Sequence, residues 1–176
     1  MDIVKLQIQK KRKELLFLFS KVYSGGLRGI DGYVVQVEAD VSDGLPGFYM
    51  VGSLASEVRE AEERVRTAMR NAGFHLSARK ITVNLSPANV RKEGTACDLP
   101  VAIAVLAAYG IVMPSGLKQT GFLGELGLDG KIKPVRGVLS MVLAMAEKGL
   151  ERCFLPEENV EEGVAADCME IVKIRN

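Results

Sequence analysis

An alternation of apolar and polar residues marks a strand near the middle of the chain. In the segment 80–86 an apolar side chain stands at every second position, from Ile81 to Leu85, with polar side chains between. This period of two predicts a half-buried strand. Residues 99–109 are apolar on every side and too few to span a membrane, which predicts a helix enclosed by the fold. The polar loop between them, residues 87–97, lies where α/β folds usually place their chemistry.

The part of the chain before this strand predicts mainly strands. A short strand is expected from Phe19 to Tyr23, and Gly25 and Gly26 are expected to form a turn after it. Between residues 33 and 41 every second residue is apolar, which predicts a long strand with one wet face, typical of antiparallel pairing. A third short strand is expected at 48–51. Together these segments predict an antiparallel amino-terminal sheet.

Helices and strands alternate in most of the remaining chain. Ser53 is the predicted cap of a helix over 55–71, which ends at Gly73 and carries the ion pairs Glu60–Arg64 and Glu62–Arg66. After the enclosed helix we expect a strand over 121–126, a hairpin turn at 128–130, a helix over 136–148, a strand over 152–155, a short helix at 156–160 and a strand over 170–174. The predicted class is α/β or α+β, in one domain with two layers.

The cap of the enclosed helix is a choice between Thr95 and Asp98. With Thr95 as N-cap, Pro100 would lie past the first turn, where its ring clashes with the carbonyl four residues back. With Asp98 as N-cap, Pro100 is the second helical residue and is tolerated. We therefore predict Asp98, and capping alone is enough to explain a carboxylate at this position.

Composition and charge restrict the function more than they identify it. The 176 residues are 48% hydrophobic and 26% charged, with a net charge of +1. Five of the basic residues lie in 1–17, against two acidic ones, which leaves a body with 18 basic and 20 acidic residues and a net charge of −2. That body is not a strongly basic nucleic-acid binder. The apolar run LLFLF, residues 15–19, is shorter than the ~7–15 residues of the apolar region of a signal peptide, so a cytoplasmic protein with no membrane segment is expected.

Metal and nucleotide chemistry find little support in the sequence. The three cysteines have no metal-ligand spacing, and they predict reduced thiols. The single histidine, His75, excludes any site that needs two imidazoles from one chain. No GxxxxGK[ST] motif is present, so no loop is expected to cradle a nucleotide triphosphate.

Four segments of the chain, taken in order, carry a family resemblance. They are FSKVYSGGLRGIDGYVVQVEADVSDGLPGFYMVG, ERVRTAMRNAGF, KITVNLSPANVRKEGTACDLPVAIAVLAA and FLGELGLDGKIKPVRGV. In this order they resemble the amino-terminal domain of the bacterial Mg-chelatase-like proteins of the ComM/YifB family. The resemblance covers residues 18–176 and leaves 1–17 as an extension, which we expect to be dispensable. It implies a fold like that of the Lon protease domain, in the ribosomal protein S-five domain-2-like group.

The same resemblance implies a role within a larger protein. Members of the family continue into an AAA+ ATPase domain, and this chain stops before that domain. ATP and Mg²⁺ are expected only in the ATPase, so no cofactor is expected in this chain. ComM-like proteins form ring-shaped helicases that promote DNA branch migration in natural transformation. The implied partners are therefore the chain's own carboxy-terminal AAA+ domain, further copies in a homo-oligomeric ring, and DNA in the assembled protein.

The likeness to Lon raises the question of peptidase chemistry. Lon uses a serine and a lysine, and these positions match Ala96 and Leu139 in this sequence. Neither residue supplies a nucleophile or a base, so a non-catalytic domain is expected. A rival hypothesis is a residual hydrolase using Cys97 or Thr95, with His75 or Lys80 as base if the fold brings them close; a small buried cysteine is the simpler interpretation of Cys97.

Four basic residues flank the strand at 80–86 and the loop after it. Arg79 and Lys80 precede it, and Arg91 and Lys92 follow it. They are candidates for contact with DNA phosphates or with a neighbouring subunit, and a solvated surface is the alternative. No aromatic residues are interleaved with them, which disfavours single-strand stacking. An autonomous DNA-binding module is the third hypothesis for the chain.

Overall fold

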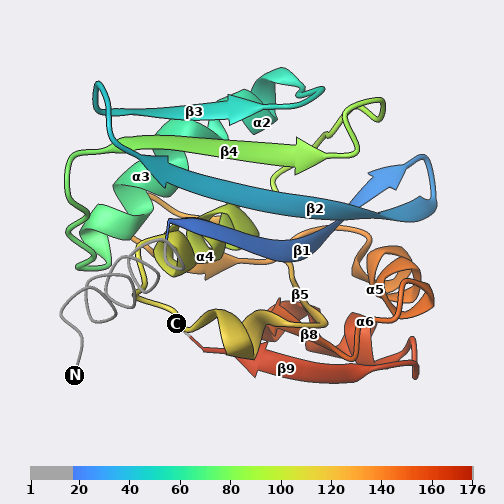
Figure 1. Cartoon of the computed structure of the whole chain (residues 1–176). Helices are drawn as coiled ribbons and strands as arrows, with labels where there is room; N and C mark the ends of the chain where they lie inside the picture. Colours follow the sequence, from blue (N-terminus) through green and yellow to red (C-terminus); the bar gives the residue numbers. More distant parts are fainter. Residues whose placement is uncertain (1–17, 176) are drawn as a thin grey trace, which may run out of the picture.

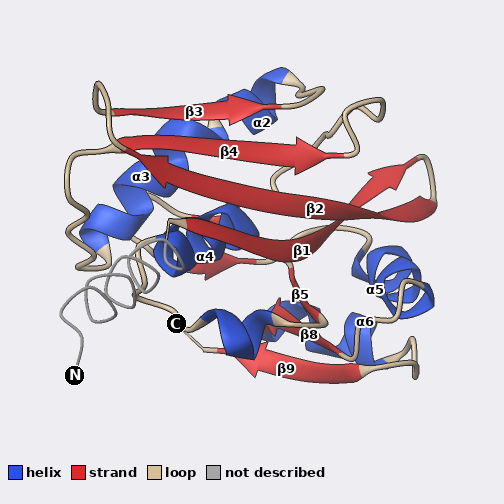
Figure 2. Ribbon diagram, in the orientation of Figure 1, coloured by secondary structure: helices blue, strands red, loops and turns tan. Residues whose placement is uncertain are grey.

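The computed structural model describes residues 18–175, and the predicted extension at 1–17 lies outside this part. Seven strands form one twisted, mixed sheet in the order β3-β4-β2-β1-β5-β8-β9 (Figure 2). Their bounds are β1 (Phe19–Arg28), β2 (Asp31–Ser42), β3 (Gly47–Val51), β4 (Lys80–Ser86), β5 (Thr120–Phe122), β8 (Arg152–Pro156) and β9 (Glu170–Ile174). A separate antiparallel hairpin joins β6 (Glu125–Leu126) to β7 (Ile132–Lys133).

Helices lie in the connections between these strands (Figure 1). They are α2 (Ser56–Arg59), α3 (Ala61–Asn71), α4 (Asp98–Ala108), α5 (Val138–Glu147) and α6 (Val160–Val164), with 3-10 turns η1 (Pro114–Leu117) and η2 (Glu157–Asn159). The arrangement is a mixed α/β fold, as predicted. Within residues 18–175, no helix is long and apolar enough to cross a membrane.

Two hydrophobic clusters lie on opposite faces of the sheet. In β8, Cys153 and Leu155 belong to one cluster, whereas Phe154 between them packs against the other. Because adjacent residues of a strand point to opposite faces, the clusters must lie on either side of the sheet. Helices α3 and α4 pack in the first cluster on one face, and α5 packs in the second cluster on the opposite face, so helices cover both faces of the sheet.

The long strand β2 confirms the pattern from which it was predicted. Its alternate residues Val35, Val37, Ala39 and Val41 are all buried. It pairs antiparallel with both β1 and β4. The predicted strand at the end of the chain is likewise confirmed, because β9 spans Glu170–Ile174.

Strand β1 corrects the expectation of a turn at Gly25 and Gly26, because the strand runs through both glycines. A Cβ on Gly25 would lie 2.5 Å from the Cβ of Met141 in α5, and one on Gly26 would lie 2.5 Å from the ring of Tyr33. The glycines therefore allow other parts of the chain to approach the strand closely. The turn comes after Arg28, where Gly29 has a φ of 65°.

The junction between β1 and β5 lies in the middle of the sheet. These two strands run parallel and pair where Tyr23 stands opposite Gly121. A Cβ on Gly121 would contact Met145 of α5, the same helix that covers Gly25. Helix α5 therefore packs across this junction.

Three further expectations are corrected. Strand β3 runs parallel to β4, so the amino-terminal sheet is not wholly antiparallel; the helical segment between the two strands is long enough to make the crossover that parallel strands need. The helix predicted over 55–71 is divided into α2 and α3, and its first cap position is Ala55 rather than Ser53. The strand predicted over 121–126 is divided between β5 and β6.

Candidate functional site in the loop before helix α4

The loop at 87–97 is held by backbone pairing with the segment that follows β3. The N–H of Lys92 donates to the carbonyl of Ser53 at 2.8 Å, and the N–H of Ala55 donates to the carbonyl of Lys92 at 3.0 Å. These bonds form a parallel bridge between Leu54 and Lys92. The middle of the loop therefore lies beside residues 53–55 like a very short strand.

The side chain of Lys92 points into the loop that carries it. It is 1% exposed, and its Nζ donates to the carbonyl of Val90 at 2.8 Å and to that of Pro87. Within residues 18–175 no carboxylate forms an ion pair with it, and burial lowers the pKa of its ammonium group. Lys92 therefore ties together the first half of the loop through hydrogen bonds to two of its carbonyls.

Cys97 is the last residue of the same loop and is buried. Its thiol donates to the Oγ of Ser24 in β1 at 3.7 Å, and Ser24 is buried as well. Burial raises the pKa of the Cys97 thiol to about 11. The thiol is therefore protonated at neutral pH, although Cys97 is the N-cap residue of α4 and a helix N-terminus favours the thiolate.

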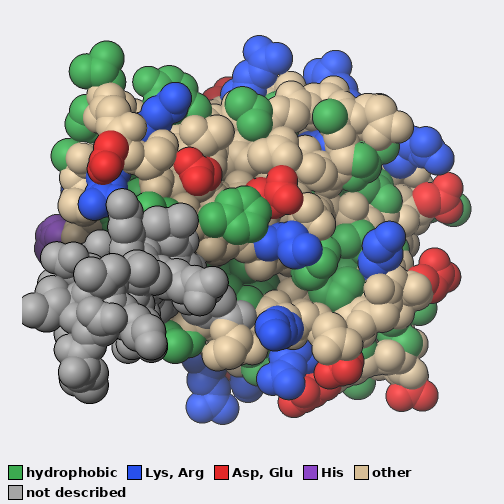
Figure 3. Space-filling view, viewed as in Figure 1, with side chains coloured by type: hydrophobic (Ala, Val, Ile, Leu, Met, Phe, Trp, Pro, Cys, Tyr) green, Lys and Arg blue, Asp and Glu red, His purple; other side chains and the backbone are tan. Residues whose placement is uncertain are grey.

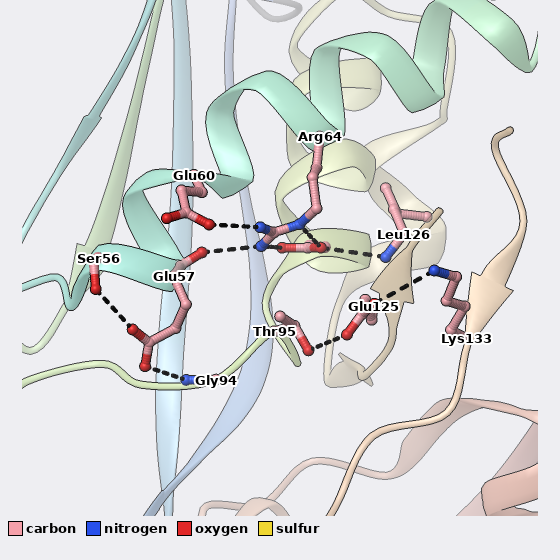
Figure 4. A network of polar contacts seen from close by, with 10 residues as sticks. Ser56, Glu57, Glu60, Arg64, Gly94, Thr95, Glu125, Leu126 and Lys133 are labelled. Atoms are coloured by element: carbon pink, nitrogen blue, oxygen red, sulfur yellow. Dashed lines mark hydrogen bonds and ion pairs between the residues drawn. The ribbon is translucent and has the colours of Figure 1, made fainter. Parts of the chain in front are cut away.

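Two side chains from other elements hold the second half of the loop (Figure 4). The hydroxyl of Thr95 donates to Oε2 of Glu125 at 2.6 Å, and Oε1 of Glu125 lies 3.7 Å from Nζ of Lys133 in β7. On the other side, the N–H of Gly94 donates to the carboxylate of Glu57 in α2 at 3.4 Å. The loop is thus connected to the β6–β7 hairpin and to α2.

The predicted capping role of Asp98 is wrong, because Asp98 is the first residue of α4 and forms a buried ion pair instead. Its side chain is 1% exposed, and Nε of Arg64 donates to Oδ2 at 3.0 Å while Nη2 donates to Oδ1 at 3.1 Å. The N–H of Leu126 donates to the same carboxylate at 3.3 Å. Burial raises the pKa of Asp98, Arg64 opposes that rise, and the carboxylate raises the pKa of Arg64.

This pair links three parts of the fold that are distant in sequence. Arg64 comes from α3, Asp98 from α4 and Leu126 from β6, and Arg64 also donates to the carbonyl of Glu57 at 3.0 Å. The predicted partner of Arg64, Glu60, lies 3.9 Å away with an exposed side chain. Local spacing predicted the weaker of the two partners.

The two positions that match the serine and lysine of Lon, Ala96 and Leu139, form hydrogen bonds through their backbone atoms. Ala96 is half-buried against the second hydrophobic cluster, and its carbonyl accepts a hydrogen bond from the N–H of Gly124 at 3.2 Å. Leu139 lies in the first turn of α5, 38% exposed, and its N–H donates to Glu162 at 3.0 Å. Neither side chain has a group that can exchange a proton.

The alternative nucleophiles do not gain the bases considered for them. Cys97 follows the far end of β4, whereas Lys80 begins that strand and His75 precedes it. The groups close to Cys97 are instead Ser24 and the Lys92 ammonium. Thr95 has Glu125 as its hydrogen-bond acceptor.

The four basic candidates separate into two groups. Arg79 lies 3.9 Å from Asp43, and Lys80 lies 5.8 Å from the ring centroid of Tyr49, both at the start of β4. Arg91 lies beyond the other end of β4, exposed beside Glu93, and Lys92 is enclosed as described. The structure therefore brings Arg79 together with Lys80 and leaves both apart from Arg91.

Sequence reasoning missed three residues that join Arg79 around a pocket. Arg66 and Arg70 of α3 and Phe74 line it together with Arg79 and His75. The spacing of Arg66 and Arg70, four residues apart, was the available signal, because such positions share one helix face. Phe74 lies beyond the end of that helix, and no local pattern predicts its place. On the face of the molecule seen in Figure 3, basic and acidic side chains are interspersed.

Metal chemistry gains no support from the described residues. Within residues 18–175 no three His, Cys, Asp or Glu side chains come together as a candidate metal site. The expectation that the chain holds no cofactor stays a prediction.

Comparison with known proteins gives a consistent family signal. The family model described as subunit ChlI of Mg-chelatase matches residues 37–159. Competence protein ComM of Haemophilus influenzae is 43% identical over 141 residues, covering 80% of this chain and 28% of the relative. Protein YifB of Escherichia coli, which is uncharacterized, is 38% identical over 143 residues, covering 81% of this chain and 28% of the relative.

A more distant similarity extends to a protease. The Lon protease of Mycolicibacterium smegmatis is 27% identical over 158 residues, covering 84% of this chain and 20% of the relative. The expected Lon-like fold is thereby confirmed. The chain spans less than a third of the length of the curated relatives it matches.

Proposed function

Because the chain belongs to the family of Mg-chelatase subunit ChlI, with ComM and YifB among its relatives, we propose that it is the non-catalytic amino-terminal domain of a cytoplasmic Mg-chelatase-like AAA+ ATPase. The observation that carries the non-catalytic role is the loop at 87–97. Where a Lon-like enzyme would present its serine, this loop presents Ala96, and Leu139 stands where the lysine would be. ATP and Mg²⁺ then act in the ATPase domain and not in this one.

The loop contacts support a structural role. The hydrogen bonds of Thr95, Gly94 and Lys92 hold the loop to the β6–β7 hairpin, to α2 and to itself. A loop fixed in this way supports a domain that keeps its shape while neighbouring copies and the AAA+ domain pack against it. We propose that its partners are its own AAA+ domain and equivalent domains in a ring.

We further propose that the assembled ring guides DNA during branch migration. One relative is a competence protein, and the family resemblance implies DNA branch migration, which together motivate this step. The body of the chain has a net charge of −2, so one copy releases few counterions on binding DNA. In a ring the same basic positions repeat, and weak contacts add through multivalency.

A comparison of this chain with the full-length protein tests the assembly proposal. Fluorescence anisotropy with a labelled DNA junction at several salt concentrations gives the affinity of each form. We expect binding by the full-length ring to be at least about 100-fold tighter, the lower range of such avidity effects. Equal, tight binding by this chain alone would favour an autonomous DNA-binding module.

The hydrolase hypothesis has one specific observation in its favour, the bond between Thr95 and Glu125. A hydroxyl that donates to a carboxylate is an arrangement of nucleophile and base. Lys133 lies 3.7 Å from Oε1 of the same carboxylate and pairs with it. Incubation with unfolded protein separates the hypotheses: we expect no turnover, and turnover that disappears in Thr95→Val or Cys97→Ala would support the hydrolase.

A further inference from the structure

A pocket lies where the end of α3 meets the starts of β3 and β4, on the side of the fold away from the loop at 87–97 (Figure 1). Its volume is about 480 Å³, within the range of small-ligand sites. Three largely buried residues form the apolar part of the wall: Phe48, Met69 and Ile81. The pocket therefore has a hydrophobic base that belongs to the main core.

The pocket is lined by three arginines, Arg66, Arg70 and Arg79, and by no acidic residue. Arg66 pairs with Glu63 at 2.8 Å, and Arg79 lies 3.9 Å from Asp43; both acidic partners are exposed. Within the described residues Arg70 forms no ion pair. Exposed pairs are weak, so an anion in the pocket can compete for these guanidinium groups.

An aromatic ring stands among these charges. Phe74 is 37% exposed, and the chain holds it in place because its N–H donates to the carbonyl of Met69 at 2.9 Å. Gly73, with a φ of 89°, ends α3 and directs residues 74–79 back along the pocket. A partly exposed aromatic ring and three guanidinium groups thus line the same pocket.

We propose that this pocket binds one nucleotide unit of single-stranded DNA, with the base against Phe74 and the phosphate between Arg70 and Arg79. The inference rests on the proposed function and identifies the part of the surface that meets the strand. Guanidinium groups bind phosphate through two parallel hydrogen bonds, and unpaired bases stack on aromatic rings. An acidic peptide would satisfy the charges and leave the ring without a partner. A base within a duplex is already stacked and cannot enter a concave pocket.

The test measures the affinity of this chain for a labelled 15-nucleotide dT strand by fluorescence anisotropy, from low to moderate salt. Arg70→Gln is expected to raise Kd about fivefold or more and to reduce the salt slope by about 0.7, the contribution of one single-strand phosphate. Phe74→Leu is expected to raise Kd about fivefold with an unchanged slope, because a stacking contact is lost. Arg59→Gln removes the same charge from the exposed helix α2 and should change Kd less than about twofold.

Two outcomes would overturn this site. One is equal affinity for the Arg70→Gln, Phe74→Leu and Arg59→Gln variants. The other is displacement of the strand by polyglutamate of the same length as effectively as by unlabelled dT, with no effect of Phe74→Leu, which would assign the pocket to acidic peptides. Melting curves of each variant confirm that the chain is folded before affinities are compared.

The same variants in the full-length protein separate this site from the proposed function. If the unmodified full-length protein binds DNA and its Arg70→Gln variant binds equally well, the pocket is overturned and the proposed function stands. If the unmodified protein does not bind DNA, the proposed function fails, and the dT titrations of this chain still decide whether the pocket takes a nucleotide.

Discussion

Single residues decide whether the centre of this fold is stable, and the pair of Arg64 and Asp98 is the clearest case. A buried carboxylate is costly unless it is paired, and Asp98 receives two bonds from Arg64 and one from Leu126. We expect Arg64→Met to lower the free energy of unfolding by about 3 kcal/mol, because it leaves the carboxylate without its partner. Urea unfolding monitored by circular dichroism gives this value.

The matched control for that change is Glu60→Gln. It removes the exposed partner of the same arginine and should cost less than about 1 kcal/mol. Equal stability of the two variants would show that the buried pair contributes no more than the exposed one.

The buried thiols give the chain a dependence on alkaline pH. Burial raises the pKa of Cys97 from 9.0 to about 11, so the folded chain holds this proton more tightly than the unfolded chain does. The resulting stability is fully present below pH 9.0 and is lost as the pH rises through 11, by about 3 kcal/mol for this group. Cys153 acts in the same direction, with its pKa raised to about 12.

Urea unfolding at pH 7.5 and at pH 10.5 measures this effect. We expect Cys97→Ala to lose less stability between the two values than the unmodified chain, and Cys168→Ala, which removes an exposed thiol, to lose as much as the unmodified chain. A Cys97→Ala variant with an unchanged dependence would mean that other groups cause the alkaline loss.

The burial of apolar residues was predictable from sequence, but the partners of buried charged residues were not. The burial of Val35 and Val37 follows from local alternation, which needs no knowledge of the fold. Local spacing predicted the pair of Arg64 with the exposed Glu60, four positions away, but not its pair with the buried Asp98, 34 positions away. Lys92 is buried because two carbonyls of its own loop accept hydrogen bonds from its ammonium group, and no local sequence pattern predicts these bonds.

Among the elements, helix α5 shows how glycine positions determine packing. Gly25 was predicted to turn the chain, because glycine is common in turns, yet it lies within β1 under Met141. We expect Gly25→Ala to cost about 1–3 kcal/mol, since the new methyl group would overlap the Cβ of Met141 and displace the helix. Thermal unfolding measures this loss.

Gly116→Ala is the control, because a Cβ at Gly116 meets no atom within 4 Å. Its effect should remain within about 0.5 kcal/mol, as for an ordinary surface change. If both alanine variants melt at the same temperature, α5 does not require the close approach.

At the scale of the whole molecule, the order and type of most elements were predictable, whereas their pairing was not. Alternation located β2 and β4, and uniform apolarity located α4. Parallel pairing of β3 with β4 depends on a crossover that local patterns do not encode. The pocket beside α3 likewise depends on how residues 74–79 return across the helix end.

The chain as a whole is not expected to hydrolyse nucleotides. It has no GxxxxGK[ST] loop, so no lysine and hydroxyl stand ready for the phosphates and Mg²⁺. We expect no release of phosphate from ATP by this chain in a malachite-green assay, with or without DNA. Release above that of a heat-denatured sample would contradict the assignment of ATP chemistry to the AAA+ domain.

The junction of β1 and β5 has a mechanical consequence. Strand β1 pairs with β2 along its whole length, but with β5 only where Tyr23 meets Gly121. A load that pulls the first four-stranded part of the sheet away from β5, β8 and β9 is therefore resisted mainly by side chains packed on the two faces of the sheet, those of α4 in the first hydrophobic cluster and those of α5 in the second. In optical-tweezers experiments with handles on β3 and β9, β1 and β5 should separate first. Met145→Ala removes a side chain of α5 that packs against Gly121 and should lower the rupture force.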